Sequence, residues 1–308
     1  MTPGRLTRLL PLLGLLALLS PLAVVAEGPV PHIAGTVVGA NGVNIRSCPR
    51  AECDVRAVAL LGDRLNVTGD EVDGFVPVEW GGVTGYAYTL YVATPTFTPQ
   101  LSQGRPGCNR VALIFNVGVG YESRLEILDN LKEERIAATV FPMGWWAAKH
   151  PDLLKQIEAD GFPIGSHGDQ RVNLTNLSDA AVKADIATAA KAIERAIGKP
   201  PEPYFTPYAA AMDERVRGMI ARAGYLPVMY SLPADDWDFD ADPDEIFMNV
   251  VPNITDGTIV EFHLDAPASA ESTAIALPWI IERLRDKGFE FVTIPELARP
   301  CGAASPAA

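Results

Sequence analysis

The sequence predicts an α/β fold, in which a barrel of parallel strands and surrounding helices follows a small all-β module. Two observations support this prediction. Short, often alternating apolar segments, separated by glycine and Asp/Asn, run from about residue 36 to residue 93, which is typical of a small β barrel or sandwich. From residue 111 onward, apolar strands alternate with helical segments, which is typical of a parallel α/β sheet or barrel. The length of 308 residues agrees with two domains.

Residues 1–26 have the pattern of a secretory signal peptide. Arg5 and Arg8 precede a leucine-rich apolar run, and small residues end that run at Ala26. An uncleaved membrane anchor is the alternative, because the run approaches the minimum spanning length. The two prolines within the run and the small residues at its end favour cleavage. We therefore expect a secreted protein that has no membrane span after cleavage.

The formal net charge of −13 limits the partners of the protein. A strongly acidic surface repels nucleic acid and anionic membranes, so neither is expected as a partner. The composition is 48% hydrophobic, which is enough to build ordinary packed cores.

Four cysteines lie in the exported part of the chain, and an even number in an oxidising compartment favours disulfides over metal ligation. Three pairings are possible. We favour Cys48–Cys53, which closes a short loop, and Cys108–Cys301, which joins the two ends of the large module. In the chain-entropy model the second bond stabilises the fold by about 4–5 kcal/mol.

The pattern along the chain places the elements of the large module. A linker with three prolines covers residues 94–107, and we expect it to be semi-extended and exposed. Helices are predicted at 122–134, 149–160, 178–197, 212–223, 244–251 and 274–287. Strands are predicted at 111–115, 137–141, 163–165, 226–230, 258–263 and 291–293.

The small module resembles a bacterial SH3 domain. The run VNIRS at residues 43–47 opens it, and the run GYAY at residues 85–88 closes it. The resemblance assigns residues 36–93 to this SH3-like domain. Because such domains often bind cell-wall peptides, it also implies a role in attaching the protein to peptidoglycan.

Several runs in the large module resemble the polysaccharide deacetylase (NodB homology) family. They are ATVF at 138–141, GFPIGSH at 161–167, NLTNLS at 173–178 and GTIVEFH at 257–263. The resemblance assigns residues 108–301 to this domain and implies a distorted NodB-type (β/α) barrel. It also implies removal of acetyl groups from an N-acetylated polysaccharide by a water molecule that Zn²⁺ or another divalent metal activates.

The positions that carry this chemistry in the family are largely substituted. Asn116 occupies the position of the catalytic base, and Val117 occupies that of a metal-binding aspartate. His167 remains as one metal ligand, whereas Arg171 replaces the second histidine. His263 remains in the position of the catalytic acid.

Two further motifs also depart from the family pattern. The segment 205–208 keeps the proline and tyrosine of its motif but lacks the arginine that orients the base. The aspartate of the fourth motif falls on Pro233. Residues 235–244 form an acidic loop, which we expect to be a solvated surface loop because its spacing does not match a calcium-binding loop.

These substitutions predict a secreted, cell-wall-associated protein that binds N-acetylated polysaccharide or peptidoglycan and has impaired catalysis without a metal cofactor. One alternative is an active deacetylase with a rebuilt metal site, in which His167 and Asp169 join His263 and Asp265. Another is an interaction scaffold in which the SH3-like domain does the binding. Aromatic residues are expected to line a sugar-binding pocket or to cap the barrel: Trp145, Trp146, Tyr204, Tyr208 and Trp237.

Overall fold

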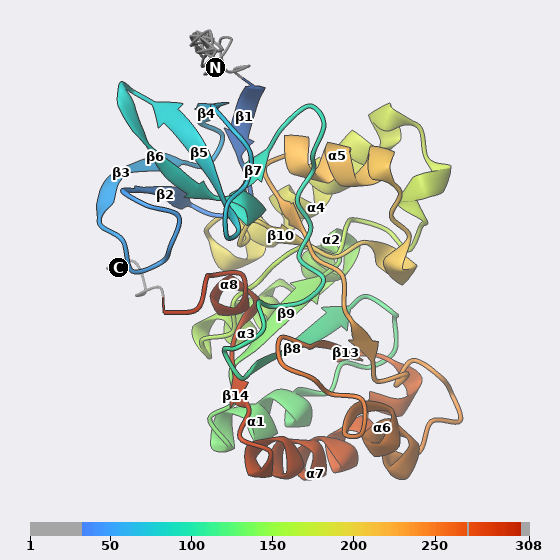
Figure 1. Ribbon diagram of the computed structural model, residues 1–308. Helices are drawn as coiled ribbons and strands as arrows, with labels where there is room; N and C mark the ends of the chain where they lie inside the picture. The colour runs from blue at the N-terminus through green and yellow to red at the C-terminus, as the bar shows by residue number, and fades with distance from the viewer. Residues whose placement is uncertain (1–32, 270, 303–308) are drawn as a thin grey trace, which may run out of the picture. The chain divides into compact units, whose positions relative to one another are not determined.

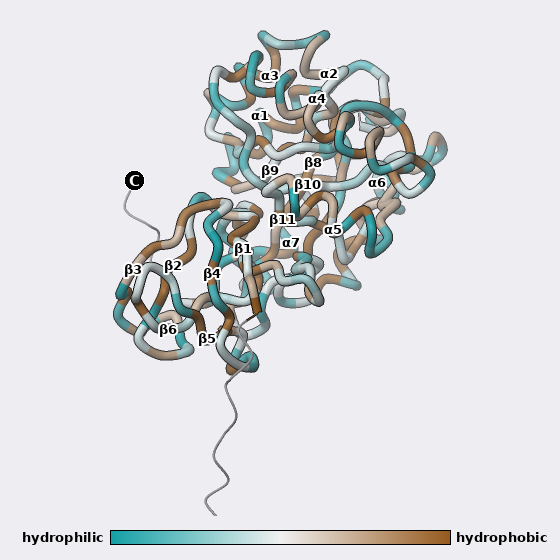
Figure 2. Tube along the Cα trace, turned by 90° about the horizontal axis from the view of Figure 1, so that it is seen from above, coloured by the Kyte–Doolittle hydropathy of each residue, from teal (hydrophilic) through white to brown (hydrophobic). Residues whose placement is uncertain are grey.

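The computed structural model describes residues 33–302 except residue 270 (Figure 1). The predicted signal peptide at residues 1–26 lies outside the described residues. Within them, no helix is both long and apolar enough to cross a membrane. Figure 2 shows strands β1–β6 gathered on one side, and β8–β11 with helices α1–α5 on the other.

The N-terminal module is a seven-stranded antiparallel sheet in the order β3-β2-β6-β5-β4-β1-β7. Its first strand begins three residues before the predicted domain start and pairs with β4 and β7. The strands are β1 (Ile33–Val37), β2 (Gly42–Arg46), β3 (Val55–Leu60), β4 (Arg64–Val67), β5 (Phe75–Trp80), β6 (Val83–Tyr88) and β7 (Val92–Ala93).

Local sequence explains the tightest hairpin of this module. Trp80 of β5 pairs with Val83 of β6, so the turn contains only Gly81 and Gly82. Both glycines have positive φ. Such two-residue turns match the twist of antiparallel strands, and glycine adopts them without steric cost.

The large module alternates strands with helices, as the sequence predicted. Its strands are β8 (Arg110–Val117), β9 (Ala138–Pro142), β10 (Tyr204–Phe205), β11 (Leu226–Pro227), β12 (Leu232–Pro233), β13 (Ile259–His263) and β14 (Glu290–Phe291). Its helices are α1 (Leu125–Glu133), α2 (Gly144–Lys149), α3 (Pro151–Ala159), α4 (Asp179–Ile197), α5 (Glu214–Arg222), α6 (Pro243–Val250), α7 (Thr273–Asp286) and α8 (Ile294–Leu297).

The strands of the large module pair in parallel around β8. Strands β13 and β9 flank β8, while β12 pairs with β13, and β14 pairs with the start of β8. Single bridges continue the ring, from Val140 to Ile164 and from Ser166 to Phe205. These irregular links between regular strands give the distorted barrel that the family resemblance implied.

Two apolar clusters fill the space on either side of the barrel wall. On the outside, Leu113 and Phe115 of β8 pack with residues of α1 and α7. On the inside, Ala112 and Ile114 belong to a cluster that includes Val43 of the SH3-like module. The alternation along β8 follows from the two-residue period of a strand. The two modules therefore share one apolar core at the end of the barrel where its strands begin.

Close backbone contacts join the two modules. The Gly39 amide donates a hydrogen bond to the Gly224 carbonyl, and the Tyr91 hydroxyl donates to the Ala298 carbonyl. Gly39 has a φ of 67°, and a Cβ atom there would lie 2.2 Å from the Leu226 Cβ. Only a residue without a side chain fits this contact without displacement.

The linker between the modules is not wholly exposed, contrary to the sequence prediction. Leu101 is buried, and it bridges Val228 at the edge of the barrel. Gly104 lies against Leu297 and Gly257, closely enough that a Cβ atom would clash with both. Only polar and proline-rich composition was visible in the sequence, whereas this docking depends on the barrel surface beneath the linker.

Both favoured disulfides are present, as Cys48–Cys53 and Cys108–Cys301. The caps of the predicted helices are also clear. Ser178 accepts a hydrogen bond from the third residue of α4, and Gly198 ends that helix with a φ of 77°.

Candidate functional site

The residues singled out on two neighbouring strands lie side by side at their carboxyl ends. Strand β13 pairs with β8 so that His263 lies opposite Asn116. These ends open into a cavity of about 380 Å³. It is lined by Asn116, Val117, Gly118, Val119, Met143, His167, Tyr208, Ala209, Tyr230, Trp237, Glu261 and His263.

A buried hydrogen-bond chain crosses the floor of this cavity. The Asn116 side-chain amide donates to Oε1 of Glu261 at 2.6 Å. The Thr206 hydroxyl donates to the Asn116 carbonyl oxygen at 3.0 Å and lies 2.8 Å from Nδ1 of His167. Asn116 therefore connects a carboxylate on β13 to the remaining histidine of the metal motif.

His167 is held as a neutral imidazole. Burial, together with the nearby charge of His263, lowers the pKa of His167 to about 3, although the hydrogen bond to the Thr206 carbonyl opposes this shift. Nδ1 lies 3.0 Å from that carbonyl oxygen, which only accepts hydrogen bonds. The proton therefore resides on Nδ1, and Nε2 carries a lone pair.

His263 forms a buried pair with an aspartate that the sequence analysis had placed incorrectly. Nδ1 of His263 lies 2.7 Å from Oδ1 of Asp236, and the other oxygen accepts from the His263 amide and the Thr273 hydroxyl. Asp236 is fully buried. The prediction that residues 235–244 form only a solvated loop was therefore wrong for Asp236.

Burial and neighbouring charges have opposite effects on the pKa values of His263 and Glu261. Burial disfavours the imidazolium form of His263, but the Asp236 carboxylate, with smaller contributions from Glu261 and Asp265, raises the pKa of His263 to about 9. Burial raises the pKa of Glu261 to about 7, against the lowering effects of His263 and of the Asn116 hydrogen bond. At neutral pH the side chain of His263 is therefore an imidazolium.

The His263–Asp236 pair predicts a loss of stability at alkaline pH. Because the pKa of folded His263 exceeds its ordinary value of 6.5, its contribution is complete below pH 6.5 and is lost as pH rises through 9. We expect the free energy of unfolding to fall by about 3 kcal/mol over this range. Asp236→Asn should remove most of the decrease. Denaturant unfolding at pH 6.5 and 9.5 would measure it, and equal decreases in both proteins would contradict this assignment.

The two residues that replace metal ligands, Val117 and Arg171, lie in different surroundings. Val117 is fully buried, borders the cavity, and belongs to the same apolar cluster as Leu113 and Phe115. Arg171 lies at the rim, where its guanidinium donates a hydrogen bond to the Val119 carbonyl and lies 5.8 Å from the centre of the Trp145 ring. The arginine thus packs across the loop that follows β8.

The structure does not assemble the rebuilt four-ligand cluster. The Asp265 carboxylate is buried and accepts hydrogen bonds from the amides of Gly118, Val119 and Gly120. The Asp169 carboxylate accepts from the Gln170 side chain and lies outside the cavity lining. Among residues 33–269 and 271–302, no three His, Cys, Asp or Glu side chains are arranged as a metal site.

Only two of the five predicted aromatic residues line the cavity, namely Tyr208 and Trp237. Trp145 lies beside it, with Nε1 donating to the sulfur of Met143. Trp146 is 1% exposed and belongs to the apolar core. The prediction of a pocket role for Trp146 was therefore wrong, because α2, which the sequence analysis did not predict, turns its ring inward.

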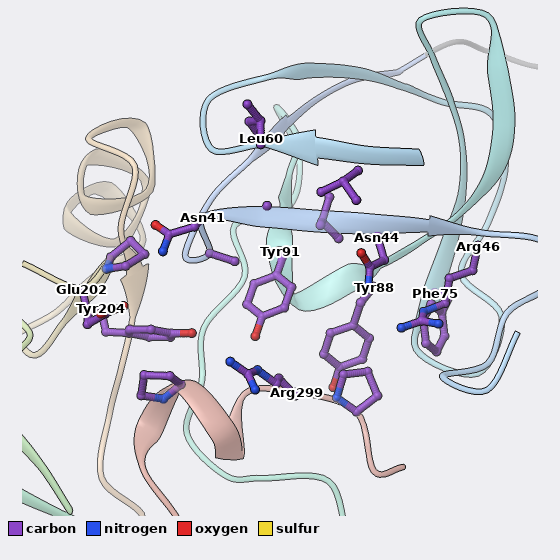
Figure 3. Close-up of a pocket in the computed structure, with 17 residues that line it drawn as sticks. Asn41, Asn44, Arg46, Leu60, Phe75, Tyr88, Tyr91, Glu202, Tyr204 and Arg299 are labelled. Atoms are coloured by element: carbon purple, nitrogen blue, oxygen red, sulfur yellow. The ribbon is translucent and has the colours of Figure 1, made fainter. Parts of the chain in front are cut away.

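Tyr204 was also placed incorrectly, because it lies at the beginning of β10 rather than at the mouth of the barrel. It borders a second cavity, of about 500 Å³, between the two modules. Figure 3 shows Tyr204 and Arg299 of the barrel domain on one side of this cavity, facing Asn41, Asn44 and Tyr91 of the SH3-like module.

Sequence reasoning missed three residues of the site: Thr206, Asp236 and Glu261. For Glu261 a signal was present, since residues two apart on a strand face the same side, and His263 was already assigned to the site. For Asp236 the local sequence gave no such signal, because several acidic residues surround it.

Models of two families match the chain. The polysaccharide deacetylase model matches residues 103–228, and the bacterial SH3 domain model matches residues 41–93. A peptidoglycan-N-acetylglucosamine deacetylase of Bacillus cereus is 31% identical over 191 residues, which cover 61% of this chain and 88% of that protein. A chitooligosaccharide deacetylase of Bradyrhizobium is 29% identical, covering 66% of this chain and 97% of that protein.

Solved structures resemble the same part of the chain. A CE4 family pseudoenzyme from Bacillus anthracis superimposes with a TM-score of 0.61 and 26% identity, covering 66% of this chain and 70% of that one. The Bc1960 peptidoglycan N-acetylglucosamine deacetylase superimposes with a TM-score of 0.60 and 28% identity, covering 64% and 91%. The barrel, the retained motif residues and these similarities agree: the chain belongs to the polysaccharide deacetylase family and carries a bacterial SH3 domain before its barrel.

Proposed function

We propose that this protein is a secreted, cell-wall-associated member of the family that binds hexosamine polysaccharide in its barrel cavity without metal-dependent deacetylation. The main observation is the pair of residues at the ligand positions. A buried valine occupies one of them, and the side chain at the other is the guanidinium of Arg171 at the rim.

The donor groups of the cavity do not fit a zinc ion. Catalytic zinc sites use three protein ligands. Here Nε2 of His167 is the single remaining ligand atom of the motif, since Val117 has no donor and Asp265 is occupied by three backbone amides. A cationic guanidinium nearby would also oppose a divalent cation.

The cavity nevertheless has the features of a sugar site. Its volume of about 380 Å³ is suited to a small ligand, and aromatic rings stand beside polar groups. Tyr208 and Trp237 offer flat apolar surfaces for the C–H face of a sugar ring. His263 and Glu261 offer a hydrogen-bond donor and an acceptor on the cavity floor.

The relatives support the class of ligand and the impaired catalysis. Those named above are a peptidoglycan-N-acetylglucosamine deacetylase and a chitooligosaccharide deacetylase, so both act on N-acetylated sugars by name. A similar structure at 26% identity is named a pseudoenzyme. The bacterial SH3 domain supports attachment to the cell wall, either beside glycan binding or, in the scaffold alternative, instead of it.

The test is binding of an N-acetylglucosamine pentamer to the mature protein, measured by calorimetry together with acetate release. Trp237 is 54% exposed at the cavity mouth, and we expect Trp237→Ala to weaken binding about tenfold, because loss of stacking on a sugar costs about 1–1.5 kcal/mol. Trp279→Ala, at a 43% exposed tryptophan on α7, is the matched control. An equal loss in both variants, or a wild type that binds neither this pentamer nor a glucosamine pentamer, would contradict the proposal.

Glu261 favours a second candidate function, hydrolysis of the acetamide without a metal. The Glu261 carboxylate would take a proton from water while the water oxygen bonds to the acetamide carbon, and His263 would donate a hydrogen bond to the developing oxyanion. The C–N bond would then break as the proton passes from Glu261 to the amine, releasing acetate. Acetate release that Glu261→Gln abolishes would favour this function over binding alone.

A further inference from the structure

We propose that the barrel cavity prefers the free amine of a de-N-acetylated hexosamine over the N-acetylated sugar, with the Glu261 carboxylate as the group that recognises the ammonium. This inference rests on the proposed function, because it assumes that the cavity binds a hexosamine polysaccharide. It makes the protein a binder of the product that deacetylation of such a polysaccharide yields.

The position of Glu261 is unusual for a carboxylate. The residue is 8% exposed, and its side chain lines the cavity. Oε1 accepts the Asn116 amide, whereas Oε2 has no hydrogen-bond partner among the residues that the structure describes. Oε2 keeps some exposure to the cavity, where a bound cation with N–H donors can reach it.

The other charged groups offset the charge of this carboxylate only in part. The charge of His263 is balanced by Asp236 at 2.7 Å. His167 is neutral at physiological pH. Within the described part of the chain, Glu261 takes part in no ion pair within 4 Å, and the Arg171 guanidinium is directed to the Val119 carbonyl and the Trp145 ring. With Glu261 ionised, the cavity floor therefore carries a negative charge that is only partly offset.

An ammonium group suits this floor better than an acetamide does. The ammonium supplies three N–H donors and a positive charge, so it can bond to the Glu261 carboxylate and to the Nε2 lone pair of His167. An acetamide supplies one N–H, does not offset the carboxylate charge, and adds an acetyl group that must be accommodated in the same space.

Residues at the mouth of the cavity also suit the amines of neighbouring sugar units in a polysaccharide chain. Trp237 lines the cavity and also a neighbouring acidic depression that includes Asp235, Asp238 and Asp240. Phe239 is 73% exposed and contacts Tyr121 edge to face, with ring centres 5.7 Å apart. Aromatic rings among carboxylates suit successive cationic sugar units, since the rings bind the sugar faces and the carboxylates attract the amines.

The test compares two pentamers with the same β-1,4 linkage, one of glucosamine and one of N-acetylglucosamine, binding to the mature protein at pH 7.5, above the pKa of about 7 of Glu261. We expect the wild type to bind the glucosamine pentamer at least tenfold more tightly. Glu261→Gln should reduce this affinity at least tenfold, and should reduce it more than it reduces the affinity for the N-acetylglucosamine pentamer, so that the preference is lost. Glu282→Gln, at an exposed position on α7, is the matched control.

Salt provides a second measurement that does not depend on a variant. The wild-type preference should decrease as sodium chloride is raised from 50 to 500 mM, because screening weakens charge attraction. Equal affinity for both pentamers, or tighter N-acetylglucosamine binding, would overturn the amine preference and leave the proposed function standing. No binding of either pentamer would overturn both.

Discussion

The triple substitution Asn116→Asp, Val117→Asp and Arg171→His is expected to create a zinc site where the wild type has none. Nδ1 of His167 already forms a hydrogen bond with Thr206, so Nε2 is available as the first ligand atom. The two other substituted ligand positions would then carry a carboxylate and an imidazole, which completes three protein ligands. We expect zinc affinity to rise from undetectable to about micromolar or tighter, which corresponds to about 8 kcal/mol or more.

Zinc content after desalting and calorimetric titration would measure this gain. The single variants Val117→Asp and Arg171→His are controls, because neither supplies three ligands, and each should remain far weaker than the triple variant. Adding His167→Ala to the triple variant should abolish binding. A folded triple variant without zinc would show that the positions equated with the family ligands do not converge in this barrel.

Gly39→Ala is expected to destabilise the protein by roughly 3 kcal/mol or more. The new Cβ would lie 2.2 Å from the Leu226 Cβ, and the backbone has a φ of 67°, which alanine adopts only with strain. Relief of the clash requires the SH3-like module to move away from the barrel, which would expose part of the apolar core that they share. Urea unfolding of the full chain would measure the loss.

Gly62→Ala provides a matched control for this substitution. Gly62 also has a positive φ, of 85°, but a Cβ atom there would have no neighbour within 4 Å. Its expected cost is therefore the backbone strain alone, about 1 kcal/mol. Equal losses at both positions would mean that the contact between Gly39 and Leu226 does not hold the modules together in solution.

Much of the fold could be predicted from local sequence signals. The strand at 258–263 and the helix at 178–197 were visible because period and capping residues are local properties. The helix is capped by Ser178 and ends at Gly198. Short elements were harder to predict: α2 has only six residues, so its period is too brief to separate the buried Trp146 from the partly exposed Trp145.

The site was less predictable because its chemistry depends on contacts between strands. Comparison with the family motif revealed that Asn116 lacks a carboxylate, but the adjacent strand supplies one 2.6 Å away, from Glu261. Position 236 is one of several acidic residues in its loop, and only the folded loop brings it to His263. A motif read along one strand cannot show that a neighbouring strand has supplied a lost group.

The apolar core that joins the two modules also determines how the protein could engage two wall components at once. The shared core surrounds Ala112 near the beginning of β8, whereas the cavity opens beside Asn116 near its end. The four residue steps from Ala112 to Asn116 span about 13 Å. When the SH3-like module binds one wall component, the cavity stays at a fixed distance from that component. This raises the effective concentration of any sugar chain that lies at the same distance. Simultaneous binding by both modules would then favour wall regions in which the two components have this spacing, in addition to favouring a particular sugar.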